Sequence, residues 1–157
     1  MNAKEEILTM NSKAMTLMEV LIVVVLIGVM AGFALASYRK TFLKATERDA
    51  VLNLTVLHGA NKIYQAKNSS YWDTNDISVT DLDVINQTLG TNIVANTAVV
   101  YSYRSNVAVD PNAFTAEAAY TDGTASNNFT LRVNETSISS TNPCCGAGNC
   151  PSRPACP

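Results

Sequence analysis

Hydrophobic residues are concentrated near the beginning of this 157-residue chain. From Met15 to Ala36 almost every residue is apolar, and Glu19 is the only charged residue. An α-helix rises about 1.5 Å per residue, so ~20 apolar residues cross the ~30 Å hydrocarbon core of a bilayer. The pattern predicts a membrane-spanning helix over residues 15–36. A carboxylate inside such a helix is costly in lipid unless a cation pairs with it.

The next segment continues the helical pattern without a break. Residues 37–67 contain no proline and only one glycine, Gly59. Apolar residues recur there at helical spacing on two neighbouring stripes. One stripe holds Leu43, Ala50, Leu54, Leu57 and Tyr64, and the other holds Leu52, Val56, Ala60 and Ile63. The sequence therefore predicts one helix from Met15 to Lys67, amphipathic over residues 37–67.

Residues 68–157 have the pattern of a small α+β head. Turn residues after Asn68 end the long helix, and Thr80-Asp81 is a capping signal for a short helix that stops at Gly90. Alternating apolar and polar residues then predict β-strands. We expect strands at 98–104, 113–120 and 129–134, a fourth near 137–139, and a hairpin loop over 121–127. The predicted fold is a long helix whose second half packs on a small antiparallel sheet.

The start of the apolar run carries a family signature. The segment from Lys13 to Gly28 reads KAMTLMEVLIVVVLIG, and it resembles the type IV prepilins and the pseudopilins of type II secretion systems. The resemblance implies a leader over residues 1–14, cleaved between Ala14 and Met15 by a membrane-embedded prepilin peptidase. The same enzyme would N-methylate Met15. Glu19 would be the family's glutamate at the fifth mature position.

The resemblance also implies how the chain assembles. The new α-amine of Met15 could pair with Glu19 in the same chain or in a neighbouring subunit, where the pair would set axial register. Gly28 and Gly32 have the Gly-x-x-x-Gly spacing that lets helices approach closely. Many relatives carry a proline late in the apolar segment, but the first proline here is Pro111. Any melting of the helix in a filament would therefore centre on residues 28–32.

Ordinary secretion is an alternative interpretation of the same run. The residues Ala34-Leu35-Ala36 fit a signal-peptidase site and would release a domain beginning at Ser37. The apolar stretch 20–36 is longer than the usual 7–15 residues of a signal core, and the leader has no net charge. Lys and Arg after the run would place that side in the cytoplasm by the positive-inside rule. The family motif nevertheless predicts an exported C-terminal domain.

Charge divides the rest of the chain into two parts. Residues 39–67 hold six basic and two acidic side chains, a net charge of +4, whereas the residues from Asn68 onward hold three basic and eight acidic ones, a net charge of −5. A basic stem with an acidic head suits attraction between neighbouring subunits. Simple solvation of both faces is the alternative. An acidic head disfavours nucleic-acid binding, which requires a basic patch.

All four cysteines lie in the last fourteen residues, at Cys144, Cys145, Cys150 and Cys156. An even number of cysteines downstream of an export signal predicts two disulfides in an oxidising compartment. Three connectivities are open, of which Cys144–Cys145 pairing is geometrically the least favourable. Binding of zinc is the alternative, although the spacing lacks two Cys-x2-4-Cys knuckles.

The sequence offers little for catalysis. His58 is the only histidine, and we expect it to face solvent or a neighbouring subunit. Nucleophile, phosphate-loop and metalloprotease motifs are not found, which favours a protein that is not an enzyme and needs no cofactor. Oxygen ligands at Asp73, Asn75, Asp76, Asp81 and Asp83 could bind calcium, but their spacing differs from that of an EF-hand and solvated acidic loops are the alternative.

These observations predict a structural subunit of a type IV pilus-like filament. It would be single-pass in the inner membrane and then part of an extracellular or periplasmic filament. Its partners would be other copies of itself, the prepilin peptidase, the membrane and the pilus assembly machinery. A secretion pseudopilin or a minor pilin is the alternative within the family. A secreted or membrane-anchored binding domain that does not polymerise is the alternative from another class.

Overall fold

The computed structural model describes residues 16–94, 98–110, 112–124, 127–136 and 138–156, without the side chains of residues 34–37. The chain divides into two compact units, Met1–Lys40 and Thr41–Pro157. One helix, α1 (Leu17–Asn68), begins in the first unit and ends in the second. The predicted single long helix is confirmed, with its described start two residues later and its end one residue later than the sequence indicated.

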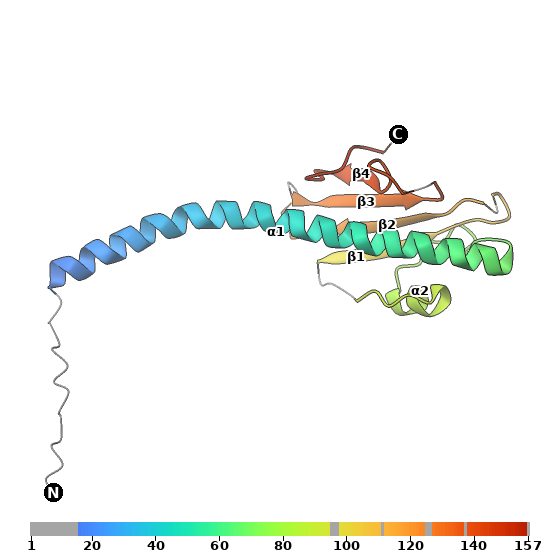
Figure 1. Ribbon diagram of the computed structural model, residues 1–157, viewed down its shortest axis with the longest axis horizontal. Coiled ribbons are helices and arrows are strands. Elements are labelled where there is room, and N and C mark those ends of the chain that lie inside the picture. Colours follow the sequence, from blue (N-terminus) through green and yellow to red (C-terminus); the bar gives the residue numbers. More distant parts are fainter. Residues whose placement is uncertain (1–15, 95–97, 111, 125–126, 137, 157) are drawn as a thin grey trace, which may run out of the picture. The chain divides into compact units, whose positions relative to one another are not determined.

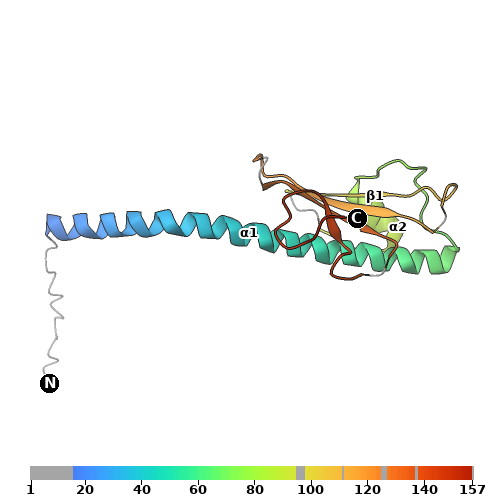
Figure 2. The ribbon, with the colours of Figure 1, turned by 90° about the horizontal axis from the view of Figure 1, so that it is seen from above.

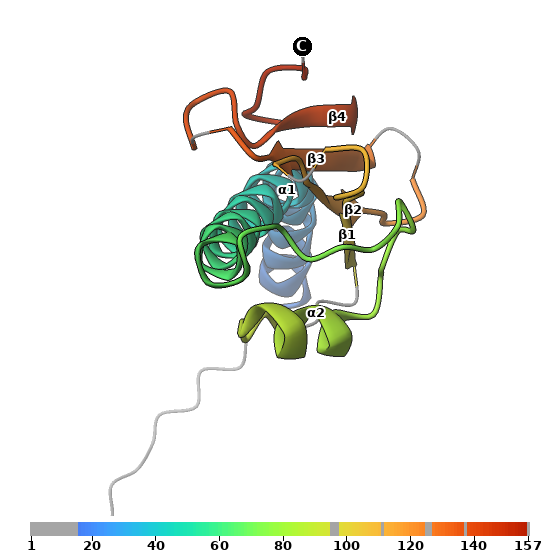
Figure 3. The same ribbon diagram turned by 90° about the vertical axis from the view of Figure 1, so that its right-hand side faces the viewer.

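The second unit is an α+β head built on a four-stranded antiparallel sheet. The strands are β1 (Val99–Arg104), β2 (Thr115–Tyr120), β3 (Phe129–Asn134) and β4 (Cys144–Gly148), and neighbours in the sheet are neighbours in sequence. The second half of α1 lies across one face of this sheet, and α2 (Leu82–Leu89) lies next to β1 (Figures 1 and 3). The fold class predicted from sequence is confirmed.

The core lies between α1 and the sheet. Alternate residues of β1, β2 and β3 are buried, because side chains along a strand point to opposite faces. They join Ala50, Leu54 and Leu57 of α1 in one buried cluster. β2 contributes the small residues Ala116 and Ala118, each 0% exposed, whereas its neighbours β1 and β3 contribute larger side chains. The cluster's other strand members are Val99, Tyr101, Tyr103, Tyr120, Phe129, Leu131 and Val133.

Of the two predicted helix stripes, one belongs to this core, and the other contributes only Ala60 to it among the described residues. Ala50, Leu54 and Leu57 are fully buried, and Leu43 and Tyr64 pack against the cluster. On the other stripe, Leu52, Val56 and Ile63 are 65%, 50% and 59% exposed. Both stripes are apolar and lie on α1, as the sequence predicts. One sheet covers only one side of a helix, so the second stripe remains open in the described chain.

The fourth strand lies elsewhere than predicted. We expected it near residues 137–139, but β4 is formed by the cysteine-containing segment Cys144–Gly148. It pairs with β3 through a register shift between Thr130 and Leu131. Gly148 has φ of +81°, and a Cβ there would collide with the backbone of Asn128, so this turn requires glycine. Residues 144–148 show no clear strand alternation in the sequence, which is why the pattern did not reveal the strand.

The short helix α2 follows its predicted signals closely. The Asp81 carboxylate accepts hydrogen bonds from the backbone N–H groups of Asp83 and Val84, which caps the N-terminus. Gly90, with φ of +68°, closes the C-terminus in the left-handed conformation. Ile85 and Leu89 of α2 are buried in the core, and Leu82 packs against it.

Candidate functional site

The candidate site is the apolar first part of α1. Every large apolar side chain from Leu17 to Phe33 is at least 42% exposed. In the part of the chain that the structure describes, α1 is the one helix long and apolar enough to cross a membrane, judged by length and composition. Exposed apolar surface of this extent marks a membrane or protein interaction site. The chain therefore combines a hydrophobic N-terminal helix with a helix-on-sheet head, which is a pilin-like architecture.

Thr16 and Glu19 form the start of this helix. The backbone N–H of Glu19 donates to the Thr16 carbonyl at 3.0 Å and to the Thr16 Oγ1 at 3.2 Å. Thr16 is therefore the N-cap, and Thr-x-x-Glu is the spacing of a capping box. The Glu19 carboxylate also lies in the first turn, where the helix dipole favours negative charge. No capping role for Thr16 was predicted from sequence, although the capping-box spacing was the signal that could have revealed it.

Of the other predicted residues in this region, the structure describes Gly28 and Gly32 but not Ala14 and Met15. Ala14 and Met15, the predicted cleavage and methylation positions, lie outside the described residues. Gly28 and Gly32 lie within an unbroken stretch of α1, and a Cβ built on either would meet no atom within 4 Å. The space around both glycines is open. A close helix contact at these positions therefore requires another chain.

The four cysteines form two disulfides, Cys144–Cys156 and Cys145–Cys150. The prediction of two disulfides is confirmed, and the structure selects one of the three connectivities. The C-terminal loop (residues 149–156) then folds back on β4. The Cys145 N–H donates to the Pro154 carbonyl at 2.7 Å, and the Cys156 N–H donates to the Cys145 carbonyl at 2.9 Å. With all four sulfur atoms oxidised, the zinc alternative has no thiolate ligands.

The prediction for His58 was wrong. His58 is only 8% exposed and is buried within the head. Its imidazole ring contacts the ring of Phe114 in a tilted arrangement, with 5.9 Å between the ring centroids. The Nε2 atom lies 2.8 Å from the Thr136 carbonyl oxygen. The sequence showed only a lone histidine in the middle of a helix. A hydrogen bond to a distant loop offsets the cost of removing its imidazole from water.

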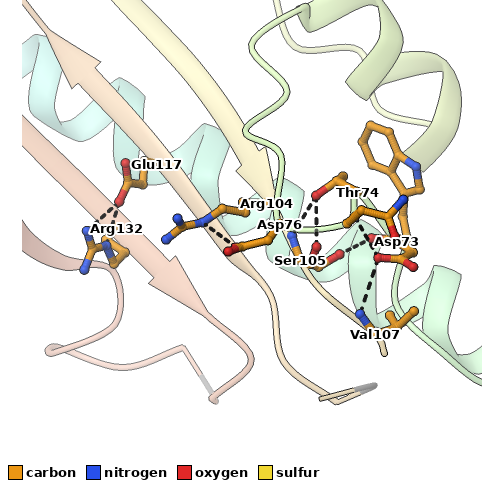
Figure 4. A network of polar contacts seen from close by, with 10 residues as sticks. Asp73, Thr74, Asp76, Arg104, Ser105, Val107, Glu117 and Arg132 are labelled. Atoms are coloured by element: carbon orange, nitrogen blue, oxygen red, sulfur yellow. Dashed lines mark hydrogen bonds and ion pairs between the residues drawn. The ribbon is translucent and has the colours of Figure 1, made fainter. Parts of the chain in front are cut away.

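The acidic residues after the long helix hold the loops of the head together (Figure 4). The Asp73 carboxylate accepts from the backbone N–H groups of Asn75 at 2.9 Å and Val107 at 3.4 Å. Asp76 forms an ion pair of 3.4 Å with Arg104, and Thr74 and Ser105 exchange two hydrogen bonds of 3.0 Å. Among the described residues, no group of three or more His, Cys, Asp or Glu side chains could hold a metal ion.

A second ion pair lies on the outer face of the sheet. The Arg132 guanidinium donates to the Glu117 carboxylate with distances of 2.6 and 2.7 Å (Figure 4). These residues stand opposite each other on β2 and β3. This face is polar and half-exposed, as expected for the solvent side of an antiparallel sheet.

The chain was compared with protein families, with curated proteins and with solved structures, and none of them matches. The similarity to pilins therefore consists of the N-terminal motif and the architecture described above.

Proposed function

We propose that this protein is a structural subunit of a type IV pilus-like filament, assembled from the inner membrane after cleavage before Met15. The observation that carries the proposal is the contrast between the two parts of α1. Ala50, Leu54 and Leu57 are buried by the protein's own sheet, whereas the apolar side chains from Leu17 to Phe33 are exposed. Such side chains require lipid or other helices around them.

A filament supplies both environments in turn. Before assembly, lipid surrounds the apolar segment of α1. In the filament, the same segments of many copies surround one another, and open space at Gly28 and Gly32 permits close approach of their backbones. Heterologous contacts that do not close into a ring then extend the polymer.

Glu19 supplies the register in this proposal. Its carboxylate lies in the first turn of α1, at the capped N-terminal end where the helix dipole favours negative charge. Cleavage before Met15 would create an α-amine four residues away. In a low-dielectric filament core, this cation and the carboxylate favour only those stackings that bring them together.

The two disulfides support export of the head, because disulfides persist in oxidising compartments. The prepilin peptidase and the pilus assembly machinery are the partners that the N-terminal motif calls for. A major pilin, a minor pilin and a secretion pseudopilin all fit this arrangement. A membrane-anchored binding domain would share the helix but would not polymerise.

The test expresses the full chain in a host with a prepilin peptidase and an assembly machinery. Mass spectrometry of the mature chain should find N-methylated Met15 as its first residue, and electron microscopy of sheared surface material should find filaments. Glu19→Ala and Glu19→Gln should be cleaved normally but fail to enter filaments, whereas Glu19→Asp, which keeps the charge, should retain part of the assembly. A mature chain that begins at Ser37 would contradict the proposal.

A further inference from the structure

Glu47 is an acidic residue that the proposed function leaves unexplained. Its side chain is only 1% exposed, although it lies on α1 near the edge of the head. One carboxylate oxygen, Oε1, accepts a hydrogen bond of 3.0 Å from the Ser152 N–H, across 105 residues of sequence. The other oxygen, Oε2, is buried and has no hydrogen-bond partner. A buried carboxylate oxygen without a hydrogen-bond partner is a place where a cation or another donor can bind.

A hollow of about 500 Å³ lies beside this carboxylate. Residues of α1 and of the C-terminal loop bound the hollow. Figure 2 shows the path of this loop over α1. Glu47, Val51 and Leu52 line it from the helix, and Ser140, Ser152 and Arg153 line it from the loops. The hollow thus combines apolar walls, which suit an aliphatic stem, with a buried acid, which suits a positively charged end.

The cations nearest in the same chain are not placed to neutralise Glu47. The Arg153 guanidinium donates to the carbonyl oxygens of Ser139 and Ser140, both at 3.1 Å. Arg48 follows Glu47 directly on the helix and also borders the hollow, and Lys44 of the same chain lies at the i, i+3 spacing of neighbouring helix residues. Among the described residues, none of these three cations forms an ion pair with Glu47.

The basic segment of residues 39–67 holds a lysine that could pair with Glu47. Lys44 is exposed and has no ion-pair partner among the described residues. We propose that the hollow beside Glu47 receives the Lys44 side chain of a second copy of this chain, so that an ion pair joins neighbouring subunits. The proposal rests on the proposed filament function and names one of its subunit contacts.

The spacing of charges along α1 supports this pairing. Lys44 precedes Glu47 by three residues, and Met15 precedes Glu19 by four. At about 1.5 Å rise per residue, a parallel neighbour would bring Lys44 level with Glu47 after a shift of about 4.5 Å and the Met15 amine level with Glu19 after a shift of about 6 Å. One axial offset therefore serves both ion pairs, because the two shifts have the same direction and nearly the same size.

Zero-length cross-linking in isotopically mixed filaments tests the contact directly. Filaments assembled from ¹⁵N-labelled and unlabelled full-length chains would be treated with a carbodiimide, which joins a carboxylate to an amine in contact with it. Mass spectrometry should find linked Glu47 and Lys44 peptides in which one partner is labelled and the other is not. Linked peptides that are always both labelled or both unlabelled would overturn the proposal, because they come from single chains.

Matched variants give a second readout. Glu47→Gln keeps an acceptor for the Ser152 N–H but loses the charge, and Lys44→Gln loses the other charge from an exposed position. Each should lower the salt concentration at which filaments dissociate by several-fold, and the double variant should be no worse than either one. Asp49→Asn, at an exposed acid nearby, is the control and should match the wild type.

The outcomes separate this proposal from the function on which it rests. Wild-type chains that are processed but never form filaments would contradict the proposed function. Filaments that form normally, lack the cross-link between chains and tolerate Lys44→Gln would contradict only the Glu47–Lys44 contact. Because Lys44 is exposed, its variant reports on the pair even where a change at Glu47 disturbs the head.

Discussion

The imidazole Nε2 of His58 and the carbonyl oxygen of Thr136 lie 2.8 Å apart, although 78 residues separate them in sequence. This hydrogen bond ties the long helix to the loop after β3. The same Thr136 carbonyl accepts from the Asn142 side-chain amide at 2.9 Å. The contact therefore joins the helix, the loop and the start of the disulfide-linked segment.

Replacement of His58 should destabilise the head. His58→Ala removes the hydrogen bond to Thr136 and the contact with Phe114, and it leaves a cavity in the head. We expect the free energy of unfolding to fall by about 2–3 kcal/mol, as for other buried polar residues with a single partner. Urea unfolding of the full chain in detergent would measure it. Ile63→Ala, at a 59% exposed position on the same helix, should change stability by less than about 0.5 kcal/mol.

The two disulfides should contribute unequally to stability. Cys144–Cys156 closes a loop with a sequence separation of 12, and Cys145–Cys150 closes one of only 5. By loop-closure entropy, loss of the first should cost about 3 kcal/mol and loss of the second about 2 kcal/mol. Paired serine substitutions followed by urea unfolding would compare them. Equal losses would show that strain or residual structure outweighs the entropy of the loops.

Two glycines should respond in opposite directions to alanine. Gly90 has φ of +68° at the end of α2, so Gly90→Ala should lower the free energy of unfolding by about 1 kcal/mol. Gly59 lies inside α1, and a Cβ added there would meet no atom within 4 Å, so Gly59→Ala should raise it by up to about 1 kcal/mol. Thermal unfolding of both variants would measure the signs. A stabilised Gly90 variant would contradict the assigned cap.

Stability should fall at alkaline pH because of Tyr103. Its side chain is fully buried, and desolvation raises the pKa of its phenol above the usual value of 10.0. The unfolded state therefore loses this proton first as pH rises above 10, and the folded state loses stability between the unfolded and the folded pKa. Unfolding followed from pH 9 to pH 12 should show this decline. Tyr103→Phe should flatten it.

At neutral pH the same variant provides the control. The Tyr103 hydroxyl donates to the Trp72 carbonyl at 3.1 Å, so Tyr103→Phe should lose about 1 kcal/mol there. Burial also raises the pKa of Tyr101, which hydrogen-bonds to the Asn53 side chain at 2.7 Å. Tyr101→Phe should therefore also flatten the alkaline decline. An unchanged profile in both variants would assign the decline to other groups.

The long helix, α2 and the three predicted strands could be recognised from sequence because their signals are local. Capping at Asp81, the glycine at Gly90 and the alternation of Phe129, Leu131 and Val133 each depend on neighbouring residues alone. The fourth strand could not be recognised in this way. Cys144–Gly148 becomes a strand because β3 offers an edge with which it pairs, and the two disulfides tie this strand to the C-terminal loop.

The sequence by itself determined the apolar helix, its glutamate at position 19, the α+β class of the head and the number of disulfides. These features follow from periodicity, residue type and spacing within one segment. Only the tertiary structure decided which helix stripe is buried, where His58 and Glu47 lie, and which cysteines pair. Those outcomes depend on segments far apart in sequence, such as Glu47 and Ser152, and residue order alone does not specify which distant groups meet.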